Sequence, residues 1–334
     1  MTLFFAAAFS AFTTFDHATV LADEAVDALA VRPDGTYVDC TLGGAGHARR
    51  VLAALGPDGH LIGFDRDAAA LDVARKRLAA TSSPATTTLI HAPFSRLAVE
   101  LAARGITAVD GILADLGVSS PQLDVAERGF SFRHDGPLDM RMDPSTGPSA
   151  ADLVATLDEA ALADLIFRFG DERDARRIAR AVVARRTTTP FTRTADLAEV
   201  VAAAKPTPKR RKAKGSKAAK PIHPATKTFQ ALRIATNGEL DELDALLHAA
   251  LDLLAPGGRL AVITFHSGED RPVKQTFAAW ARGPELPPAQ AVYRTHGDPL
   301  VRLPHPKGVV ATAAETAANP RARSARLRVA EKLP

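Results

Sequence analysis

Residues 37–47, Tyr-Val-Asp-Cys-Thr-Leu-Gly-Gly-Ala-Gly-His, decide the fold, because a short apolar strand here runs into a glycine-rich turn and a helix. Glycines let the backbone approach a ligand closely, and the first turn of a helix offers amide groups without partners inside the helix. The next apolar segment ends on Asp65, which lies 22 residues after Gly43. A carboxylate at this spacing suits the hydroxyl groups of a ribose at the neighbouring strand tip. The stretch therefore predicts a nucleotide-type cofactor site.

Segments that read as strands alternate with segments of helical periodicity on both sides of this stretch. We expect strands at 37–40, 60–64, 86–90, 109–114, 259–265 and 326–330. We expect helices at 47–55, 68–80, 94–103, 229–254 and 269–282, and a turn at 255–258. This alternation predicts an α/β protein with a Rossmann-like parallel sheet and helices on both of its faces.

The pattern changes between about Asp124 and Ala235, where no convincing strand occurs. Helices are expected there at 149–169, 171–186 and 194–204, with Ser149 and Thr194 as N-caps of the first and third. The simplest architecture is a doubly wound sheet with an all-helical domain inserted after its fourth strand. We expect a flexible extension at 1–16, the sheet domain at 17–124 and 236–334, and the inserted substrate-recognition domain at 125–235.

Composition narrows the class of protein. A chain of 334 residues suits one large domain or two ordinary ones, and a net charge of +4 does not by itself identify a nucleic-acid binder. The single cysteine, Cys40, excludes an intramolecular disulfide and multi-cysteine zinc sites, and it fits a reducing cytoplasm. No segment reaches the roughly 18 apolar residues of a membrane span. The apolar residues 1–12 lack the basic residues that precede the apolar part of a secretory signal.

The strongest charge run is Lys205–Lys220, which holds eight cations and no anion. Its lysines, prolines and small residues predict an exposed loop. Two interpretations stay open for this basic loop: a solvated surface segment, or a segment that contacts RNA.

The glycine turn favours one cofactor over two others. After Gly44-Ala-Gly46 the chain continues His-Ala-Arg49, so the third glycine of a dinucleotide site is missing, and no Walker lysine follows a glycine loop anywhere. Asp39 at the start of the turn disfavours a pyrophosphate and suits a cationic group. The amino group and the sulfonium of S-adenosyl-L-methionine are such groups, so the turn favours a methyltransferase over a dehydrogenase.

Residues 110–124, Asp-Gly-Ile-Leu-Ala-Asp-Leu-Gly-Val-Ser-Ser-Pro-Gln-Leu-Asp, place Asp115 at the carboxyl end of the fourth strand. Open α/β sheets bind their ligands at that edge. The following residues, 127–144, are rich in glycine, proline and charge without periodicity, which is typical of a functional loop.

From His17 to Lys332 the chain resembles the RsmH (MraW) family of bacterial 16S ribosomal RNA cytosine-N(4) methyltransferases. The glycine turn carries this resemblance together with the strings at 17–21, 116–123, 135–144, 223–230, 265–267 and 319–324. Three departures occur: Ala45 and Ala48 stand where the family usually has Gly and Ser, Gly268 stands where it usually has Leu, and the basic loop is longer.

The resemblance implies a cytoplasmic enzyme that uses S-adenosyl-L-methionine and no metal. Its substrate would be the exocyclic N(4) of a cytosine in the P site of 16S ribosomal RNA, within the small ribosomal subunit, without membrane or DNA partners. The implied cofactor contacts are Ala45, Gly46, His47, Asp65, Phe94, Asp115 and Gln122. The oligomeric state stays open between monomer and homodimer.

Asp115 is the side chain that topology places best for catalysis, as an acceptor for the target amine, although it could instead hold the cofactor. Second candidates are Asp139, His266, Ser267 and Glu269. The cations that could line an RNA path are Arg133, Arg141, Arg173, Arg176, Arg177, Lys227, Arg233, Arg321 and Arg323.

Three rival functions stay open at this point. One is a nicotinamide-dependent oxidoreductase and another is a catalytically silent RNA-binding ribosome-assembly factor. The third is a DNA methyltransferase, but such enzymes commonly carry Asp/Asn-Pro-Pro-aromatic after the fourth strand, where this chain has Asp115-Leu-Gly-Val.

Overall fold

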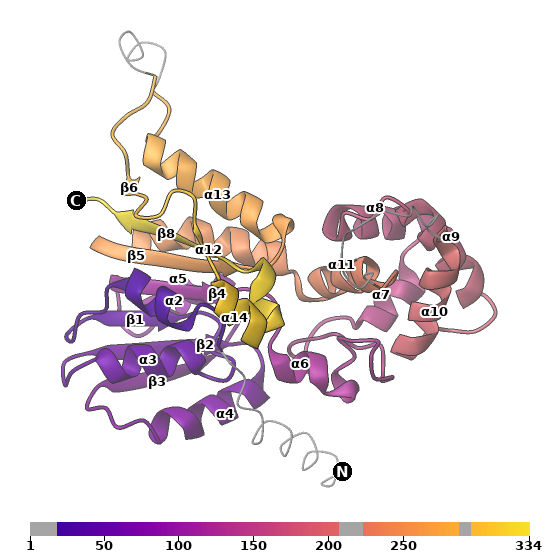
Figure 1. Ribbon diagram of the computed structural model, residues 1–334, viewed down its shortest axis with the longest axis horizontal. Helices are drawn as coiled ribbons and strands as arrows, with labels where there is room; N and C mark the ends of the chain where they lie inside the picture. Colours follow the sequence, from indigo (N-terminus) through magenta and orange to yellow (C-terminus); the bar gives the residue numbers. More distant parts are fainter. Residues whose placement is uncertain (1–18, 207–222, 287–294) are drawn as a thin grey trace. The chain divides into compact units, whose positions relative to one another are not determined.

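The computed structural model describes residues 19–206, 223–286 and 295–334 (Figure 1). The expected extension at 1–16 and most of the basic loop at 205–220 lie outside these residues. The chain divides into two compact units: an α/β unit from Met1–Gly117 and Leu240–Pro334, and a helical unit from Val118–Glu239. The helical unit thus begins before the insert expected at 125–235 and ends after it.

The α/β unit is built on one sheet with the strand order β3-β2-β1-β4-β5-β8-β6, and β7 pairs with β8. Strands β1 to β5 run parallel, and β8 is antiparallel to β5. All six expected strands are confirmed, whereas β6 and β7 were not expected. The bounds are β1 Thr36–Asp39, β2 His60–Asp65, β3 Thr86–His91, β4 Val109–Asp115, β5 Leu254–Thr264, β6 Val301–Arg302, β7 Val309–Val310 and β8 Arg326–Lys332.

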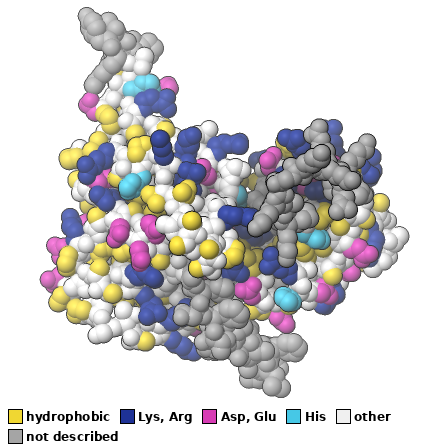
Figure 2. Space-filling view, viewed as in Figure 1, with side chains coloured by type: hydrophobic (Ala, Val, Ile, Leu, Met, Phe, Trp, Pro, Cys, Tyr) yellow, Lys and Arg dark blue, Asp and Glu magenta, His cyan; other side chains and the backbone are white. Residues whose placement is uncertain are grey.

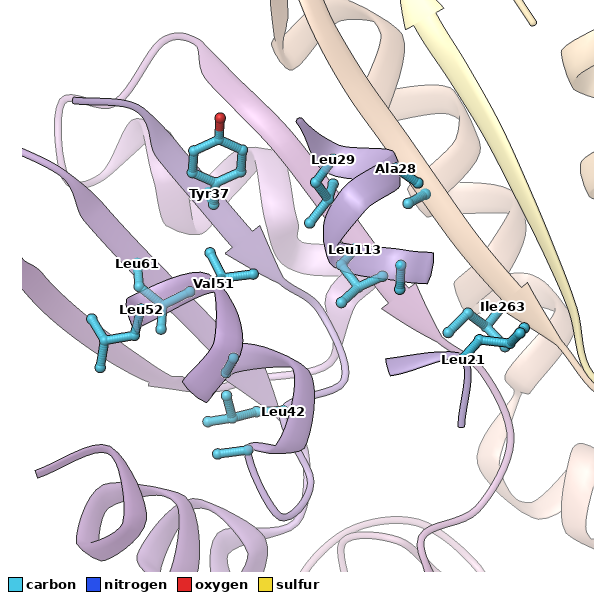
Figure 3. Close-up of a cluster of buried hydrophobic side chains, with 14 of the residues drawn as sticks. Leu21, Ala28, Leu29, Tyr37, Leu42, Val51, Leu52, Leu61, Leu113 and Ile263 are labelled. Carbon is cyan, nitrogen blue, oxygen red and sulfur yellow. The ribbon is translucent and has the colours of Figure 1, made fainter. Parts of the chain in front are cut away.

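Helices cover both faces of this sheet, as the sequence predicted. One face carries α2 (Ala22–Leu29), α3 (Gly46–Ala54) and α4 (Ala68–Ala79), and the other carries α5 (Leu97–Ala102), α12 (Glu239–Leu253) and α13 (Ser267–Arg282). Each face of the sheet packs against its helices to form a hydrophobic core: the first core lies under α2, α3 and α4, and the second under α5, α12 and α13. Successive residues of a strand point to opposite faces, so Tyr37 belongs to the first core and Val38 to the second. Figure 3 shows Leu29 of α2 and Val51 of α3 in this core together with Tyr37, Leu61 and Leu113 of the sheet. Each large side chain buried there stabilises the fold by about 1.5–3 kcal/mol.

The turn expected at 255–258 is wrong, because these residues lie inside β5. The pairing shifts from Val109 with Leu254 to Gly111 with Arg259, which makes this stretch a bulge in the strand. Gly257 has a φ of +81° there, a conformation that glycine adopts without strain.

Two helices that the sequence predicted as continuous are each broken in two. Between α7 (Ala150–Thr156) and α8 (Glu159–Gly170), Leu157 is extended, and Asp158 caps α8 by accepting the Ala161 N–H at 2.7 Å. Gly238, with a φ of +60°, separates α11 (Thr226–Asn237) from α12. The apolar periodicity continues through both breaks, so periodicity alone did not show them.

The described part of the helical unit holds helices and no strand. Besides α7, α8 and α11 it contains α6 (Ser120–Asp124), α9 (Ala175–Arg186) and α10 (Thr194–Ala204). The Ser149 cap of α7 is confirmed, with a capping box to Asp152. The Thr194 cap of α10 is wrong, because Asp135 accepts the Ala195 N–H while the Thr194 hydroxyl accepts the Gly136 N–H.

The remaining elements of the α/β unit are short: α14 (Ala313–Ala318) and the 3-10 segments Phe94–Arg96 and Pro320–Ser324. The helix expected at 94–103 is therefore a 3-10 turn followed by α5. Among the described residues, no helix is both long enough and apolar enough to cross a membrane.

Candidate functional site

The glycine turn is fixed by the acid at the next strand tip. Gly43 has a φ of +47° and donates its N–H to Oδ2 of Asp65 at 2.7 Å. The other oxygen of Asp65 accepts the N–H of Asp67 at 2.8 Å. Two backbone amides thus hold this carboxylate at the carboxyl end of β2.

Ala45 and Gly46 form the start of α3. Ala45 adopts the left-handed conformation, with φ 59° and ψ 31°. A Cβ at Gly46 would lie 1.9 Å from Oγ1 of Thr19, so a side chain there would have to displace Thr19. The first amides of α3 have no partners inside the helix, which makes this turn suitable for an anionic group such as a carboxylate.

His47 links this turn to the start of the described chain. Its ring is 5% exposed, and Nε2 lies 3.0 Å from the Val20 carbonyl, to which it donates. Nδ1 is then the unprotonated nitrogen, and it lies 3.9 Å from Oδ2 of Asp115, too far for a hydrogen bond. Burial lowers the pKa of His47 to about 4, so the ring is neutral near pH 7.

Three carboxyl groups interact electrostatically near the carboxyl ends of β1, β4 and β5: Asp39, Asp115 and Glu269. Burial raises the pKa of Asp39 to about 7, although the Thr41 N–H donates to it at 3.0 Å. Burial also raises the pKa of Asp115 well above its usual range, and the charges of Asp39 and Glu269 add to this effect. Within the described residues, Oδ1 of Asp115 is shielded from solvent without a hydrogen-bond partner.

This edge fits a ligand that brings a positive charge. A cation beside Asp39 and Asp115 would stabilise both carboxylates, whereas a pyrophosphate would be repelled by them. The amino group and sulfonium of S-adenosyl-L-methionine meet this requirement, and the first turn of α3 suits its carboxylate. No group of three or more His, Cys, Asp or Glu that could hold a metal occurs in the part of the chain that the structure describes.

The structure brings six of the seven expected cofactor residues into the α/β unit. Phe94 is half-buried after β3 and packs against the second core. Gln122 lies in the helical unit, where its side chain is 5% exposed and accepts the Ser119 N–H at 3.0 Å, which caps α6. Asp39, which the sequence interpretation used only to choose the cofactor, belongs with the site by position; its place at the end of a strand before glycines was the available signal.

The second catalytic candidates differ in their surroundings. Asp139 lies in the helical unit and receives two hydrogen bonds from the Arg141 guanidinium, at 2.8 and 2.7 Å. Ser267 is exposed at the start of α13. His266 and Glu269 lie together in the α/β unit, with Nε2 and Oε1 3.0 Å apart.

The cations expected along an RNA path are mostly exposed. Arg141 and Arg233 are instead held by ion pairs with Asp139 and Glu239, both at 2.7 Å. Figure 2 shows Lys and Arg side chains on the visible face of each unit. The exposed members of the expected set are Arg133, Arg173, Arg176, Arg177, Lys227 and Arg323.

The sequence interpretation missed three residues that lie around the glycine turn or hold the segment beside it: Thr19, Val20 and Glu315. The Leu21 N–H donates to Oε1 of Glu315 at 2.7 Å, so α14 holds the segment whose Thr19 and Val20 contact the glycine turn. The string at 17–21 pointed to this segment without showing what it touches.

Several solved structures are similar to this chain at low sequence identity. An rRNA methylase from Streptococcus thermophilus is 12% identical, with 95% of this chain and 99% of that chain covered and a TM-score of 0.42. TrmN from Thermus thermophilus is 15% identical, with 97% and 52% covered and a TM-score of 0.43. A SAM-dependent O-methyltransferase from Thermotoga maritima is 9% identical, with 98% and 71% covered and a TM-score of 0.37.

Comparison with protein families gives a match over nearly the whole chain. The match covers residues 14–333, and so it includes the glycine turn, the β4 tip and the helical unit. The protein belongs to the MraW methylase family.

Proposed function

We propose that the protein transfers a methyl group to the exocyclic N(4) of a cytosine in the P site of 16S ribosomal RNA, within the small ribosomal subunit. The observation that carries this proposal is the Asp115 carboxyl at the tip of β4, whose Oδ1 has no partner among the described residues. An amine that is to be methylated needs such an acceptor. The identity of the base and of the RNA rests on the family resemblance.

S-adenosyl-L-methionine is the cofactor of this family, and when bound it supplies a methyl group on positively charged sulfur. Asp65 would accept the ribose hydroxyls, and Phe94 would pack against the adenine. The backbone from Ala45 to His47 would bind the carboxylate, and Gln122 is the remaining cofactor contact that the family resemblance implies.

Asp115 would act on the nucleophile. The lone pair of N(4) is delocalised into the cytosine ring, and a hydrogen bond from the amine to a carboxylate returns electron density to the nitrogen. Without a cation nearby, burial and the charges of Asp39 and Glu269 keep a proton on Asp115 at pH values where an ordinary aspartate is ionised. A bound cation reverses this effect, so Asp115 would become an acceptor only when the methyl donor is in place.

Substrate binding would use the exposed cations. A base leaves its stack to enter such a site, which costs least in single-stranded RNA. Contacts from Arg173, Arg176 and Arg177 on and beside α9 to phosphates would weaken steeply with salt. The helical unit, together with the basic loop 205–220, would then recognise the RNA, as expected of an inserted substrate-recognition domain.

The test is transfer of labelled methyl to small subunits from cells that lack the enzyme, with mapping of the modified base. We expect a single N(4)-methylated cytosine in 16S ribosomal RNA. Asp115→Asn should lower single-turnover transfer by at least about 100-fold, the usual effect of losing a catalytic acid–base group. Asp110→Asn is the matched control, because Asp110 lies on the same strand but pairs with Arg32.

Four outcomes would contradict the proposal. Methyl on another base would show a different substrate. Binding to small subunits without any transfer would indicate an assembly factor, and binding of NAD in place of S-adenosyl-L-methionine an oxidoreductase. Near-normal turnover and cofactor affinity in Asp115→Asn would show that Asp115 neither accepts a hydrogen bond from the target amine nor holds the cofactor.

A further inference from the structure

An exposed histidine stacks on a phenylalanine just before α11 in the helical unit. The ring centroids of His223 and Phe132 are 4.5 Å apart, and the ring planes are inclined by 32°. Phe132 is half-buried against the hydrophobic core of the helical unit, where Phe229 meets it edge-on at 4.9 Å. His223 is exposed even though Phe132 covers one face of its ring. Its accessible surface therefore includes the opposite face of the imidazole.

Hydrogen bonds fix the orientation of this ring. Nδ1 of His223 accepts the Ala225 N–H at 3.2 Å, and the His223 carbonyl accepts the Thr226 N–H at 3.0 Å. Because Nδ1 accepts, the neutral ring carries its proton on Nε2. The next residue, Pro224, is also held, since its carbonyl accepts a hydrogen bond from Nζ of Lys205 at 3.3 Å. An exposed ring that is already oriented loses little conformational entropy when a ligand binds.

Exposed cations lie beside this pair of rings in the chain. Arg133 and His134 follow Phe132 directly, and both are exposed. Lys227 is exposed in the first turn of α11, where Nζ donates to the Asp171 carbonyl at 2.6 Å. Its positive charge thus meets a neutral backbone group at this contact.

Two carboxylates of the same region are already neutralised by cations. Asp135 forms an ion pair with Arg193, and the buried Glu172 forms one with Lys205. The basic loop 205–220 ends three residues before His223 and adds cations without an anion to the sequence here. The charges suit a polyanion.

We propose that the exposed imidazole of His223, backed by Phe132, stacks on an unpaired base of the RNA substrate. This inference rests on the proposed function and names a contact between that RNA and the helical unit. Unpaired RNA bases bind proteins by stacking on aromatic side chains, histidine included, while cations bind the phosphates. Every base has a π face, so the stack accepts any base.

A simpler role for His223 is to fix the start of α11 through the Ala225 N–H, and two substitutions separate the roles. His223→Asn keeps a side-chain acceptor for that N–H but removes the ring. His223→Phe keeps a ring that can stack but removes the acceptor. We expect RNA affinity to follow the ring and thermal stability to follow the acceptor.

The experiment measures the affinity of each variant for unmethylated small subunits, together with single-turnover methyl transfer over a range of subunit concentrations. We expect His223→Asn to weaken binding by about 5- to 100-fold, the range for the loss of one base–aromatic stack. The rate at saturating subunits should stay within about 2-fold of wild type, because a stack present before and during the reaction stabilises both states equally. His223→Phe should bind within about 3-fold of wild type.

The salt dependence of binding distinguishes stacking from charge. His223→Asn should leave the slope of log affinity against log salt unchanged. Arg133→Gln should reduce the magnitude of that slope by about 0.7, the value for one phosphate contact with a single strand. His248→Asn is the matched control, because it removes an exposed imidazole from α12 in the α/β unit, and it should bind like wild type.

Two results would overturn the inference alone, because neither depends on which base is methylated. One is wild-type affinity in His223→Asn. The other is a loss of affinity in folded His223→Phe as large as that in His223→Asn. Absence of methyl transfer by the wild-type enzyme, or methyl on a base other than cytosine, would overturn the proposed function instead.

Discussion

The buried and half-buried carboxylates of the α/β unit and those of the helical unit have opposite surroundings. At the strand tips, burial raises the pKa of Asp39 to about 7, and it also raises the pKa of Asp115 well above its usual range. In the helical unit, burial alone would raise the pKa of Asp139 and Glu172. Hydrogen bonds from Arg141 and Lys205 outweigh it, so both pKa values lie below their usual range.

This difference in pKa shifts is what we expect if the strand tips are a binding site and the carboxylates of the helical unit have a structural role. Paired carboxylates stabilise the folded helical unit, because the pair exists only there. Carboxylates gathered without cations destabilise the ligand-free α/β unit, and a cationic ligand would relieve that cost. We therefore expect a bound cationic cofactor to add stability to the α/β unit and to leave the stability of the helical unit unchanged.

The largest expected effect that tests this comparison is the dependence of the free energy of unfolding on the protonation of Asp39. The folded protein holds a proton on Asp39 up to about pH 7, and the unfolded chain releases it near 3.8. Ligand-free stability from this group is thus highest below that lower value and falls as pH rises to 7, by as much as roughly 4 kcal/mol. Urea unfolding of wild type and Asp39→Asn at several pH values should show a larger loss in the wild type, because in the variant only the raised pKa of Asp115 still contributes at this edge. Parallel curves for the two proteins would contradict it.

The second effect concerns Asn237, which ties the loop before α7 to α11 in the helical unit. Its Oδ1 accepts the Met142 N–H at 2.8 Å, and its Nδ2 donates to the carbonyls of Met140 and Arg233 at 2.8 and 2.9 Å. Asn237→Ala should cost about 3 kcal/mol in urea unfolding, because buried backbone groups lose their partners. Gln230→Ala on the same helix is the control and should cost less than about 0.5 kcal/mol. Equal effects would show that the tie is not needed.

Glu172 should show a smaller effect with the opposite pH dependence to Asp39. Its side chain is 5% exposed and Oε2 lies 2.5 Å from Nζ of Lys205, itself 21% exposed. Glu172→Gln should cost about 2 kcal/mol at pH 7, less than the loss of a fully buried pair. Because the folded pKa is lowered, this cost should fade as pH falls through that value. A cost that persists in acid would point to packing instead.

The smallest expected effect is the change in stability when Ala45 or Gly43 of the glycine turn is substituted. Ala45 and Gly43 both have positive φ values, 59° and 47°. Ala45→Gly should raise stability by about 1 kcal/mol, and Gly43→Ala should lower it by a similar amount, since a Cβ is strained in this conformation. Thermal unfolding of the two variants with and without S-adenosyl-L-methionine checks both signs. Destabilisation by Ala45→Gly would show that the alanine Cβ contributes packing that outweighs its strain.

The sequence predicted the elements better than their breaks. Apolar runs and helical periodicity placed all six long strands and the helices beside them. The breaks at Asp158 and Gly238 escaped prediction because apolar periodicity continues across them, and one capping side chain or one left-handed glycine decides each. β6 and β7 escaped because two residues carry no pattern.

The candidate site could be predicted by position but not by its interactions. Parallel strands place Asp65, Asp115 and His266 at one edge by topology alone. The side-chain contacts of the site depend on packing between distant segments or on the path of a turn. They are the contact of Thr19 with Gly46, the hydrogen bond from His47 to the Val20 carbonyl, and the closeness of Glu269 to His266. The raised pKa of Asp39 likewise follows from burial, which spacing in a sequence does not measure.

The interrupted sheet has a consequence for how the chain folds as it is synthesised. β4 ends at Asp115 and its neighbour β5 begins at Leu254, with the whole helical unit made in between. A nascent chain therefore exposes the open edge of β4 until β5 emerges, while the helices can already pair locally. Chains stopped before Leu254 keep that edge unpaired and are prone to aggregate, and slower translation of the insert prolongs the same exposure.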